Sequence, residues 1–229
     1  VSTYPRVAAV KPIVDAALAN AKKVGETPVG EVTDDITTAY NGSNRDDRAN
    51  ESTLGNLVSD AVLAQVKKTT AGADLAVTNP GGLRNELFFA KDPNVASDKD
   101  GSVNYAEANA VLPFVNNLSS VTLSGASLKK VFEQQWQTNA DGTIPSRPFL
   151  ALGSSSNVRW TYDDTRPAGD RITSLWVDDK PVSPTASYKV AVPSFLVSGG
   201  DNFRAFTEGK GVDTGLVDYE AWIDYLQKN

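Results

Sequence analysis

The fold is decided by one segment, Leu75-Ala76-Val77-Thr78-Asn79-Pro80-Gly81-Gly82-Leu83-Arg84. Residues 75–78 are apolar or β-branched and predict a short buried strand, and the Asn-Pro-Gly-Gly run that follows predicts a turn. The two glycines allow the backbone to approach a ligand closely or to adopt positive φ. Arg84 adds a planar fork of donors that suits a phosphate or a carboxylate. On spacing alone, a tight turn with a solvated arginine is the simpler interpretation.

A helix is predicted immediately before this strand. Ser52 or Thr53 can cap its N-terminus, it runs to about Thr70, and Gly72 lies just past its end. Helical spacing places a row of apolar side chains on its buried face: Leu54, Leu57, Val58, Ala61, Val62 and Ala64.

The first 30 residues form a separate segment. Apolar residues at helical spacing predict a helix that Gly25 ends: Val7, Val10, Val14, Ala17, Leu18 and Ala21. Pro12 either kinks this helix or occupies its first turn. The polar residues 26–50 predict one or two strands with a loop. We therefore divide the chain into residues 1–30, a helix with the turn after it, and residues 31–229, the main domain.

Beyond Arg84, helices and strands are mixed without a regular βαβ rhythm. Polar residues 91–104 predict a surface loop. Ser124 can cap a helix over residues 126–137, with four side chains directed inward: Leu128, Val131, Phe132 and Trp136. Strands are predicted at residues 118–123, 158–162, 172–177 and 188–192, and a last helix at 217–227. This pattern predicts the α+β class, with a mixed or antiparallel sheet flanked by helices.

The overall composition is that of a folded, acidic domain. The 229 residues are 40% hydrophobic and 22% charged, which is enough for a sizeable core. The net charge of -6 disfavours nonspecific binding to nucleic acid or to an anionic membrane, because both attract clusters of Lys and Arg. No apolar run approaches the roughly 20 residues of a membrane-spanning helix. The sequence begins at Val1, as expected of a processed or trimmed protein.

Cysteine and histidine are both absent. The lack of cysteine excludes disulfides, thiolate nucleophiles and Cys-based metal sites. The lack of histidine excludes Ser-His-Asp and Cys-His triads, His-ligated metals and the usual general base near neutral pH. We therefore expect no catalytic residue and no metal site in this chain, and binding is a better first hypothesis than catalysis.

A second glycine-bearing loop, Leu196-Val197-Ser198-Gly199-Gly200-Asp201-Asn202-Phe203, follows the strand at 188–192. Asp201 beside aromatic residues suits a sugar diol, whose hydroxyls can donate to the two carboxylate oxygens, although a turn with packed phenylalanines explains the loop equally well. Phe114, after Pro113, is by itself typical of a core residue. If Phe114 and Phe195 reach one cleft, they could stack a flat heterocycle, at about 1–3 kcal/mol per stacked base.

A mixed-charge patch, Asn44-Arg45-Asp46-Asp47-Arg48, precedes the helix that begins near Ser52. It is either a solvated loop with weak ion pairs or the source of a second arginine for an anionic ligand.

Six segments in register over most of the chain resemble the C-terminal, substrate-binding domain of the 5′-nucleotidase family, which includes UDP-sugar hydrolase and 2′,3′-cyclic phosphodiesterase. The segments are Glu51-Ser52-Thr53-Leu54-Gly55-Asn56-Leu57 with Asp60-Ala61, Asn79-Pro80-Gly81-Gly82-Leu83-Arg84, Pro113-Phe114-Val115-Asn116, Val121-Thr122-Leu123-Ser124-Gly125, Gly169-Asp170-Arg171-Ile172, and Phe195-Leu196-Val197-Ser198-Gly199-Gly200-Asp201. The helix of residues 6–24 is similar to the family's linker between its two domains.

The resemblance implies a role for each matching residue. Phe114 and Phe195 correspond to the two rings that sandwich the base, and Asp201 to the carboxylate that holds the ribose hydroxyls. Asn79 corresponds to the side chain that faces the base edge. The loop glycines that belong with these substrate-binding residues are Gly81, Gly82 and Gly200.

Two arginines correspond to those that reach the phosphate. They are Arg84 and Arg48, but the segment before Glu51 departs from the commoner pattern, and Arg45 could serve instead of Arg48.

The resemblance also implies partners and location. The parent protein would be a secreted, periplasmic or cell-wall-associated phosphoester hydrolase, whose N-terminal metallophosphatase domain holds two divalent metal ions. This chain would then bind a nucleotide or nucleoside, such as AMP, a UDP-sugar or a cyclic nucleotide, and would have no hydrolytic activity alone. The alternative is a free-standing extracellular module for nucleotides or sugars, without a catalytic partner.

Overall fold

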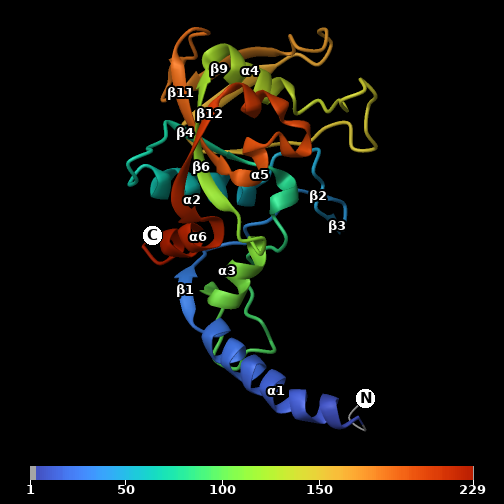
Figure 1. Cartoon of the computed structure of the whole chain (residues 1–229), viewed down its shortest axis with the longest axis vertical. Helices are drawn as coiled ribbons and strands as arrows, with labels where there is room; N and C mark the ends of the chain where they lie inside the picture. The colour runs from blue at the N-terminus through green and yellow to red at the C-terminus, as the bar shows by residue number, and fades with distance from the viewer. Residues whose placement is uncertain (1–3, 229) are drawn as a thin grey trace.

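The computed structural model describes residues 4–228. It has a body built around a mixed sheet, from which one long helix extends (Figure 1). The helices are α1 (Pro5–Gly25), α2 (Thr53–Val66), α3 (Tyr105–Val111), α4 (Gly125–Glu133), α5 (Ser194–Val197) and α6 (Asp218–Leu226), with 3₁₀ turns η1 (Pro80–Gly82), η2 (Gly200–Asn202) and η3 (Arg204–Glu208). The strands are β1 (Pro28–Glu31), β2 (Tyr40–Asn41), β3 (Asn44–Arg45), β4 (Leu75–Thr78), β5 (Ser102–Asn104), β6 (Asn117–Ser124), β7 (Gly153–Ser154), β8 (Val158–Tyr162), β9 (Ile172–Val177), β10 (Lys180–Pro181), β11 (Ser187–Pro193) and β12 (Lys210–Val217). The predicted α+β class is confirmed.

The central sheet has the order β12-β6-β11-β4-β7. Strands β11 and β4 run parallel, and the other neighbouring pairs are antiparallel. Pro193 at the end of β11 lies opposite Leu118 near the start of β6, and Val217 at the end of β12 lies opposite Asn117. The chain therefore leaves β4, β11 and β12, and enters β6, at one edge of the sheet.

The two faces of this sheet carry two separate cores, because side chains alternate along each strand. On one face Ala76 and Ala191 pack with residues of α2, α3 and α6, among them the fully buried Trp222. On the other face Leu75 and Val190 pack with α4, η3 and the second sheet, whose order is β10-β9-β8. Helices thus cover one face of the sheet, and helices together with the second sheet cover the other.

Both predicted helix caps are present, but both helices are shorter than expected. The Ser52 hydroxyl accepts from Gly55 N at 3.0 Å, and α2 ends at Val66 rather than Thr70. The Ser124 hydroxyl accepts from Ser127 N at 3.1 Å, and α4 ends at Glu133 rather than at residue 137. After α4 the chain leaves the helical path, and Trp136 forms an isolated antiparallel bridge with Phe149.

The prediction of a surface loop over residues 91–104 is wrong for residues 102–104. Residues 102–104 form β5, which pairs with β1, because Val103 is a core side chain that is 1% exposed. Strand β12 and helix α3 were not expected either. Strand β12 is largely exposed and carries two glycines, so it lacks the apolar alternation that identifies a strand.

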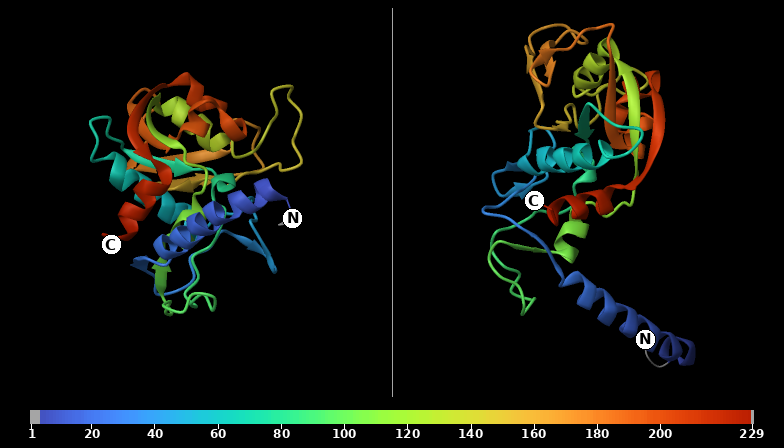
Figure 2. Two further views of the ribbon diagram at one scale, coloured as in Figure 1. Left: turned by 60° about the horizontal axis from the view of Figure 1, so that its bottom comes forward. Right: turned by 90° about the vertical axis from the view of Figure 1, so that its left-hand side faces the viewer.

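Helix α1 projects from the body: it begins far from the body and joins it at its C-terminal end (Figures 1 and 2). Among its described residues only Gly25 is buried, and Pro12 lies inside the helix. The division at residue 30 remains a prediction, but β1 spans that point and Val29 is 3% exposed in the core. These observations favour a boundary at the end of α1.

Candidate functional site

A cavity of about 390 Å³ opens at the sheet edge where four strands begin or end. Its lining comes from segments far apart in the sequence: Arg48, Thr78, Asn79, Gly81, Gly82, Leu112, Phe114, Asn116, Pro193, Phe195, Asp201 and Asp218. Seven of these residues are ones that the sequence analysis named as substrate-binding: Arg48, Asn79, Gly81, Gly82, Phe114, Phe195 and Asp201.

The sheet topology explains why these residues meet. Asn79 follows β4 and Phe195 follows β11, and the carboxyl ends of parallel neighbouring strands lie at the same edge. Phe114 precedes β6, which enters the sheet at that edge because it is antiparallel to β11. Asp218 follows β12, which is antiparallel to β6. Each strand therefore delivers one or more side chains to the same place.

Polar groups converge at the glycine turn of residues 79–82. Asn79 Nδ2 donates to Asp201 Oδ2 at 2.7 Å. A Cβ on Gly81 would lie 2.9 Å from Arg48 Nη1 and 3.3 Å from Asp201 Oδ2, so both charged groups approach the bare backbone there. Only glycine leaves this space open. The turn thus gathers an amide, a carboxylate and a guanidinium around one backbone segment.

The Asp201 loop has an unusual backbone. Gly199, Asp201 and Asn202 all have positive φ, at 82°, 51° and 61°. Asp and Asn are among the residues that tolerate this left-handed conformation. A Cβ on Gly200 would lie 2.6 Å from the Phe195 ring, so Gly200 packs directly beneath it. The loop therefore sets the positions of both the Asp201 carboxylate and the Phe195 ring.

Two aromatic rings are open at the cavity. Phe114 is 56% exposed and Phe195 is 43% exposed, although both line a concave surface. Arg84 does not line the cavity; its guanidinium carbon lies 5.7 Å from the centre of the Phe114 ring, within range of a cation–π contact. Arg84 therefore sits at the rim, against Phe114.

The structure separates the two arginines that the sequence left as alternatives. Arg48 is largely buried beside the cavity, and its Nε and Nη2 bond the Asp46 carboxylate at 3.0 and 2.8 Å. Hydrogen bonding to Asp46 raises the pKa of Arg48. Burial acts in the opposite direction, whereas the negative charges of Asp46 and Asp201 raise the pKa of Arg48 further. Arg45 Nε instead pairs with the buried Glu86 at 2.7 Å. Only Arg48 of the two lines the cavity.

Five lining residues were not named as site residues: Thr78, Leu112, Asn116, Pro193 and Asp218. Four of them adjoin segments that were named, so their positions could have been inferred from the predicted strand ends. Asp218 could not be, because it follows β12, which lacks the alternation of a predicted strand.

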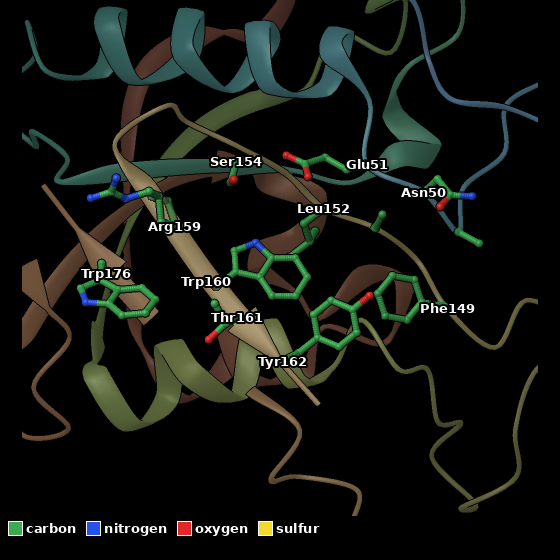
Figure 3. A pocket seen from close by; sticks show the side chains of 13 residues that line it. Asn50, Glu51, Phe149, Leu152, Ser154, Arg159, Trp160, Thr161, Tyr162 and Trp176 are labelled. Atoms are coloured by element: carbon green, nitrogen blue, oxygen red, sulfur yellow. The ribbon is translucent and has the colours of Figure 1, made fainter. Parts of the chain in front are cut away.

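A larger cavity of about 710 Å³ lies elsewhere, between β8 and the segment before α2. Its aromatic lining includes Trp160 and Tyr162, which project from β8, with Glu51 on the opposite side (Figure 3). Its charged groups already have partners, since Glu51 accepts from Asn56 Nδ2 at 2.7 Å and Arg159 pairs with Asp179. None of the predicted site residues lines it, so the smaller cavity is the candidate site.

Among residues 4–228, no group of three or more acidic side chains is arranged to hold a metal ion. Within the same residues, no helix combines the length and apolar character needed to cross a bilayer.

The sequence of this domain has clear relatives. A family profile described as "5'-nucleotidase, C-terminal domain" matches residues 16–208. The chain belongs to the 5′-nucleotidase C-terminal domain family. The resemblance inferred from the six segments is therefore confirmed.

Three relatives align with most of this 5′-nucleotidase C-terminal domain. It is 30% identical over 215 residues to the trifunctional nucleotide phosphoesterase protein YfkN of Bacillus subtilis, covering 90% of this chain and 13% of that protein. It is 30% identical over 197 residues to the cell wall protein Lmo0130 of Listeria monocytogenes, covering 85% of this chain and 23% of that protein. A 5′-nucleotidase precursor from Thermus thermophilus superposes with a TM-score of 0.70 at 29% identity, covering 93% of this chain and 39% of that one.

The chain thus spans well under half the length of each of these relatives. The rest of each relative lies outside the part that aligns with this chain. The 5′-nucleotidase C-terminal domain described here corresponds to one part of a larger architecture.

Proposed function

We propose that this domain recognises the substrate of an exported, metal-dependent phosphoester hydrolase that acts on nucleotides. One observation carries the proposal: two open aromatic rings, a carboxylate and an arginine meet at one cavity, although they come from three distant segments. Stacking surfaces combined with diol and phosphate partners are the chemistry that a nucleotide requires.

Each group has a distinct task in this proposal. Phe114 and Phe195 stack the base, at about 1–3 kcal/mol per stacked base. Asp201 accepts hydrogen bonds from the ribose hydroxyls, and Asn79 both orients that carboxylate and faces the base edge. Arg48, with Arg84 at the rim, draws the phosphate towards one side of the cavity.

The binding energy of such a domain is used for positioning. Holding a nucleotide at a fixed orientation brings its phosphate to the reacting groups of another domain. The described residues offer no cluster that fits a two-metal centre, so those metals would belong to the parent's metallophosphatase domain. We expect no release of phosphate from AMP by this chain alone, even with added Mg²⁺, Mn²⁺ or Zn²⁺.

We place the parent protein outside the cytoplasm or at the cell wall. The name of the Listeria relative, a cell wall protein, supports this location.

A calorimetric titration with adenosine and AMP tests the proposal. Because this domain would supply only part of the substrate cleft of the parent protein, it should bind each ligand with a dissociation constant on the order of 0.1–1 mM. This is equivalent to a binding free energy of about -4 to -5.5 kcal/mol. Phe195→Ala should weaken adenosine binding about 5-fold or more, because it removes one stacking surface. A matched control is Phe88→Ala, since Phe88 is 48% exposed and does not line the cavity. Flat titrations with both ligands, or equal affinity in Phe195→Ala and wild type, would contradict the proposal.

A further inference from the structure

Asp218 and Asn116 form a closed pair at the cavity. Asn116 Nδ2 donates to Asp218 Oδ2 at 2.9 Å, and Asp218 N donates to Asn116 O at 2.9 Å. The second carboxylate oxygen accepts from Tyr219 N at 2.7 Å. This pair, the Asn116–Asp218 clamp, joins the start of α6 to the segment that enters β6.

The clamp is costly for the fold. Asp218 is 2% exposed, and no cation among the described residues forms an ion pair with it. Burial raises the pKa of Asp218, while the hydrogen bonds from Asn116 and from the Tyr219 backbone lower it. Burying a carboxylate among neutral donors costs free energy that a neutral residue at this position would not. A role beyond helix stability would explain its presence.

The segment held by the clamp carries Phe114. Val115 separates Phe114 from Asn116 and has a φ of 57°, a left-handed conformation that is rare for a β-branched residue. Leu112, 5% exposed, fixes the chain on the other side of Phe114. The ring itself is 56% exposed, with the Arg84 guanidinium carbon 5.7 Å from its centre at the rim. The clamp fixes the residue directly after Val115 and so limits how the segment that carries Phe114 can move.

We propose that Asp218 is a positioning residue that, through Asn116, holds Phe114 in the orientation needed to stack a nucleobase. This inference rests on the proposed function, because it assumes that Phe114 stacks a base. It assigns a task to the one ionisable lining residue to which the nucleotide-binding scheme gives no role.

A double-mutant cycle with adenosine as the probe tests the inference. Phe114→Ala should weaken binding about 5-fold or more. Asp218→Ala and Asn116→Ala should each weaken it by about 3- to 10-fold, because a freed Val115 relaxes and the ring leaves its position. Combined with Phe114→Ala, neither should weaken binding further, since the ring on which they act is gone. A general structural effect would instead be additive.

A double variant that exchanges the two clamp residues should restore adenosine binding. In Asn116→Asp/Asp218→Asn the amide donates to the carboxylate from the opposite side, and the oxygen of the amide introduced on α6 still accepts from Tyr219 N. Binding should return to within about 2-fold of wild type. Asp213→Ala is the matched control, because Asp213 accepts from the adjacent Asn117 at 3.3 Å on the exposed side of the same strand pair. Its adenosine affinity should not change.

The outcomes separate the two proposals. Unchanged affinity in Phe114→Ala would contradict the stacking scheme itself. A weakened Phe114→Ala with additive or absent effects of Asp218→Ala and Asn116→Ala would overturn only the clamp. Circular dichroism and thermal melts identify any variant that fails to fold. If Asp218→Ala is such a variant, Asn116→Ala and the exchanged pair decide, and an exchanged pair that folds without recovering affinity also overturns the clamp.

Discussion

Arg45 and Arg48 lie three positions apart and have different roles in the structure. Arg45 neutralises Glu86, whose side chain is 2% exposed and which also accepts from the Thr38 hydroxyl at 2.7 Å. Arg48 is held by Asp46 through Nε and Nη2, while its Nη1 lies close to Gly81 at the cavity. One arginine therefore supports the fold, and the other keeps a charged group available to a ligand.

Arg48→Ala and Arg45→Ala should separate these tasks. We expect Arg48→Ala to weaken AMP binding about 10-fold or more relative to adenosine, because a charge-assisted hydrogen bond to the phosphate is worth about 1.5–3 kcal/mol. Arg45→Ala should leave the AMP-to-adenosine ratio unchanged and lower the free energy of unfolding by about 1–3 kcal/mol, since Glu86 loses its counter-charge. Calorimetry and urea unfolding measure the two effects, and a reversed pattern would exchange the assignments.

The residues of the site were predictable where a local pattern marked them. Asn79 and Gly81 stand in a turn after an apolar strand, and Asp201 stands in a glycine loop, so their backbone requirements are visible in the sequence. The choice between Arg45 and Arg48 was not visible. It depends on Glu86, 41 residues after Arg45, and such a pairing has no local sequence pattern.

At the scale of elements, Glu208 joins η3 to α4. Its carboxylate accepts from the Ser127 hydroxyl at 2.7 Å and from Lys130 Nζ at 2.9 Å. The Ser127 hydrogen bond, followed by those of Lys130, lowers the pKa of Glu208 from its ordinary value of 4.5. A carboxyl whose pKa is lowered by folding stabilises the fold above 4.5, and this contribution is lost as the pH falls through the lowered pKa.

We therefore expect Glu208→Gln to remove part of the acid sensitivity. The variant should be less stable than wild type at pH 7, and the difference should be smaller at a second, acidic pH below the lowered pKa, where the wild-type carboxyl has taken up its proton. Urea unfolding at both pH values measures the difference. Glu31→Gln, at the exposed end of β1, is the control and should match wild type at both. A difference that stayed constant with pH would refute the electrostatic explanation.

The elements found from sequence are those with strong periodicity. The apolar runs of β4, β9 and β11 are buried on the central or second sheet, and the Ser caps of α2 and α4 are local signals. The ends of α2 and α4 and the edge strands β5 and β12 were missed. The positions of the two strands depend on pairing with distant strands, and the exposed strand β12 needs no apolar alternation.

At the scale of the whole molecule, α1 contributes little to the body. Its apolar residues are mostly exposed, with Ile13 at 70% and Leu18 at 62%, and only Gly25 is buried among its described residues. A surface helix that buries no apolar stripe gains little from tertiary packing. The core beneath the site is instead closed by α6, where Trp222 Nε1 donates to Ala108 O at 3.1 Å.

A variant that begins at Gly25 should consequently keep the stability and the site of the full chain. We expect its free energy of unfolding to differ by less than about 1 kcal/mol and its adenosine affinity to be unchanged, because no cavity residue belongs to α1. Urea unfolding and calorimetry test both points. A variant that starts at Val32 and lacks β1 is the contrasting control, since it removes the core residue Val29 and the partner of β5. A large loss of stability in the first variant would show that α1 is part of the core.

The long helix also has a mechanical consequence. Its 21 residues extend over about 31 Å at 1.5 Å per residue, and the body holds it only near Gly25. It therefore acts as a lever arm. A rotation of about 10° at its base displaces Pro5 by about 5 Å, so a distance between a dye near Pro5 and one on the body would amplify movements too small to detect at the base itself.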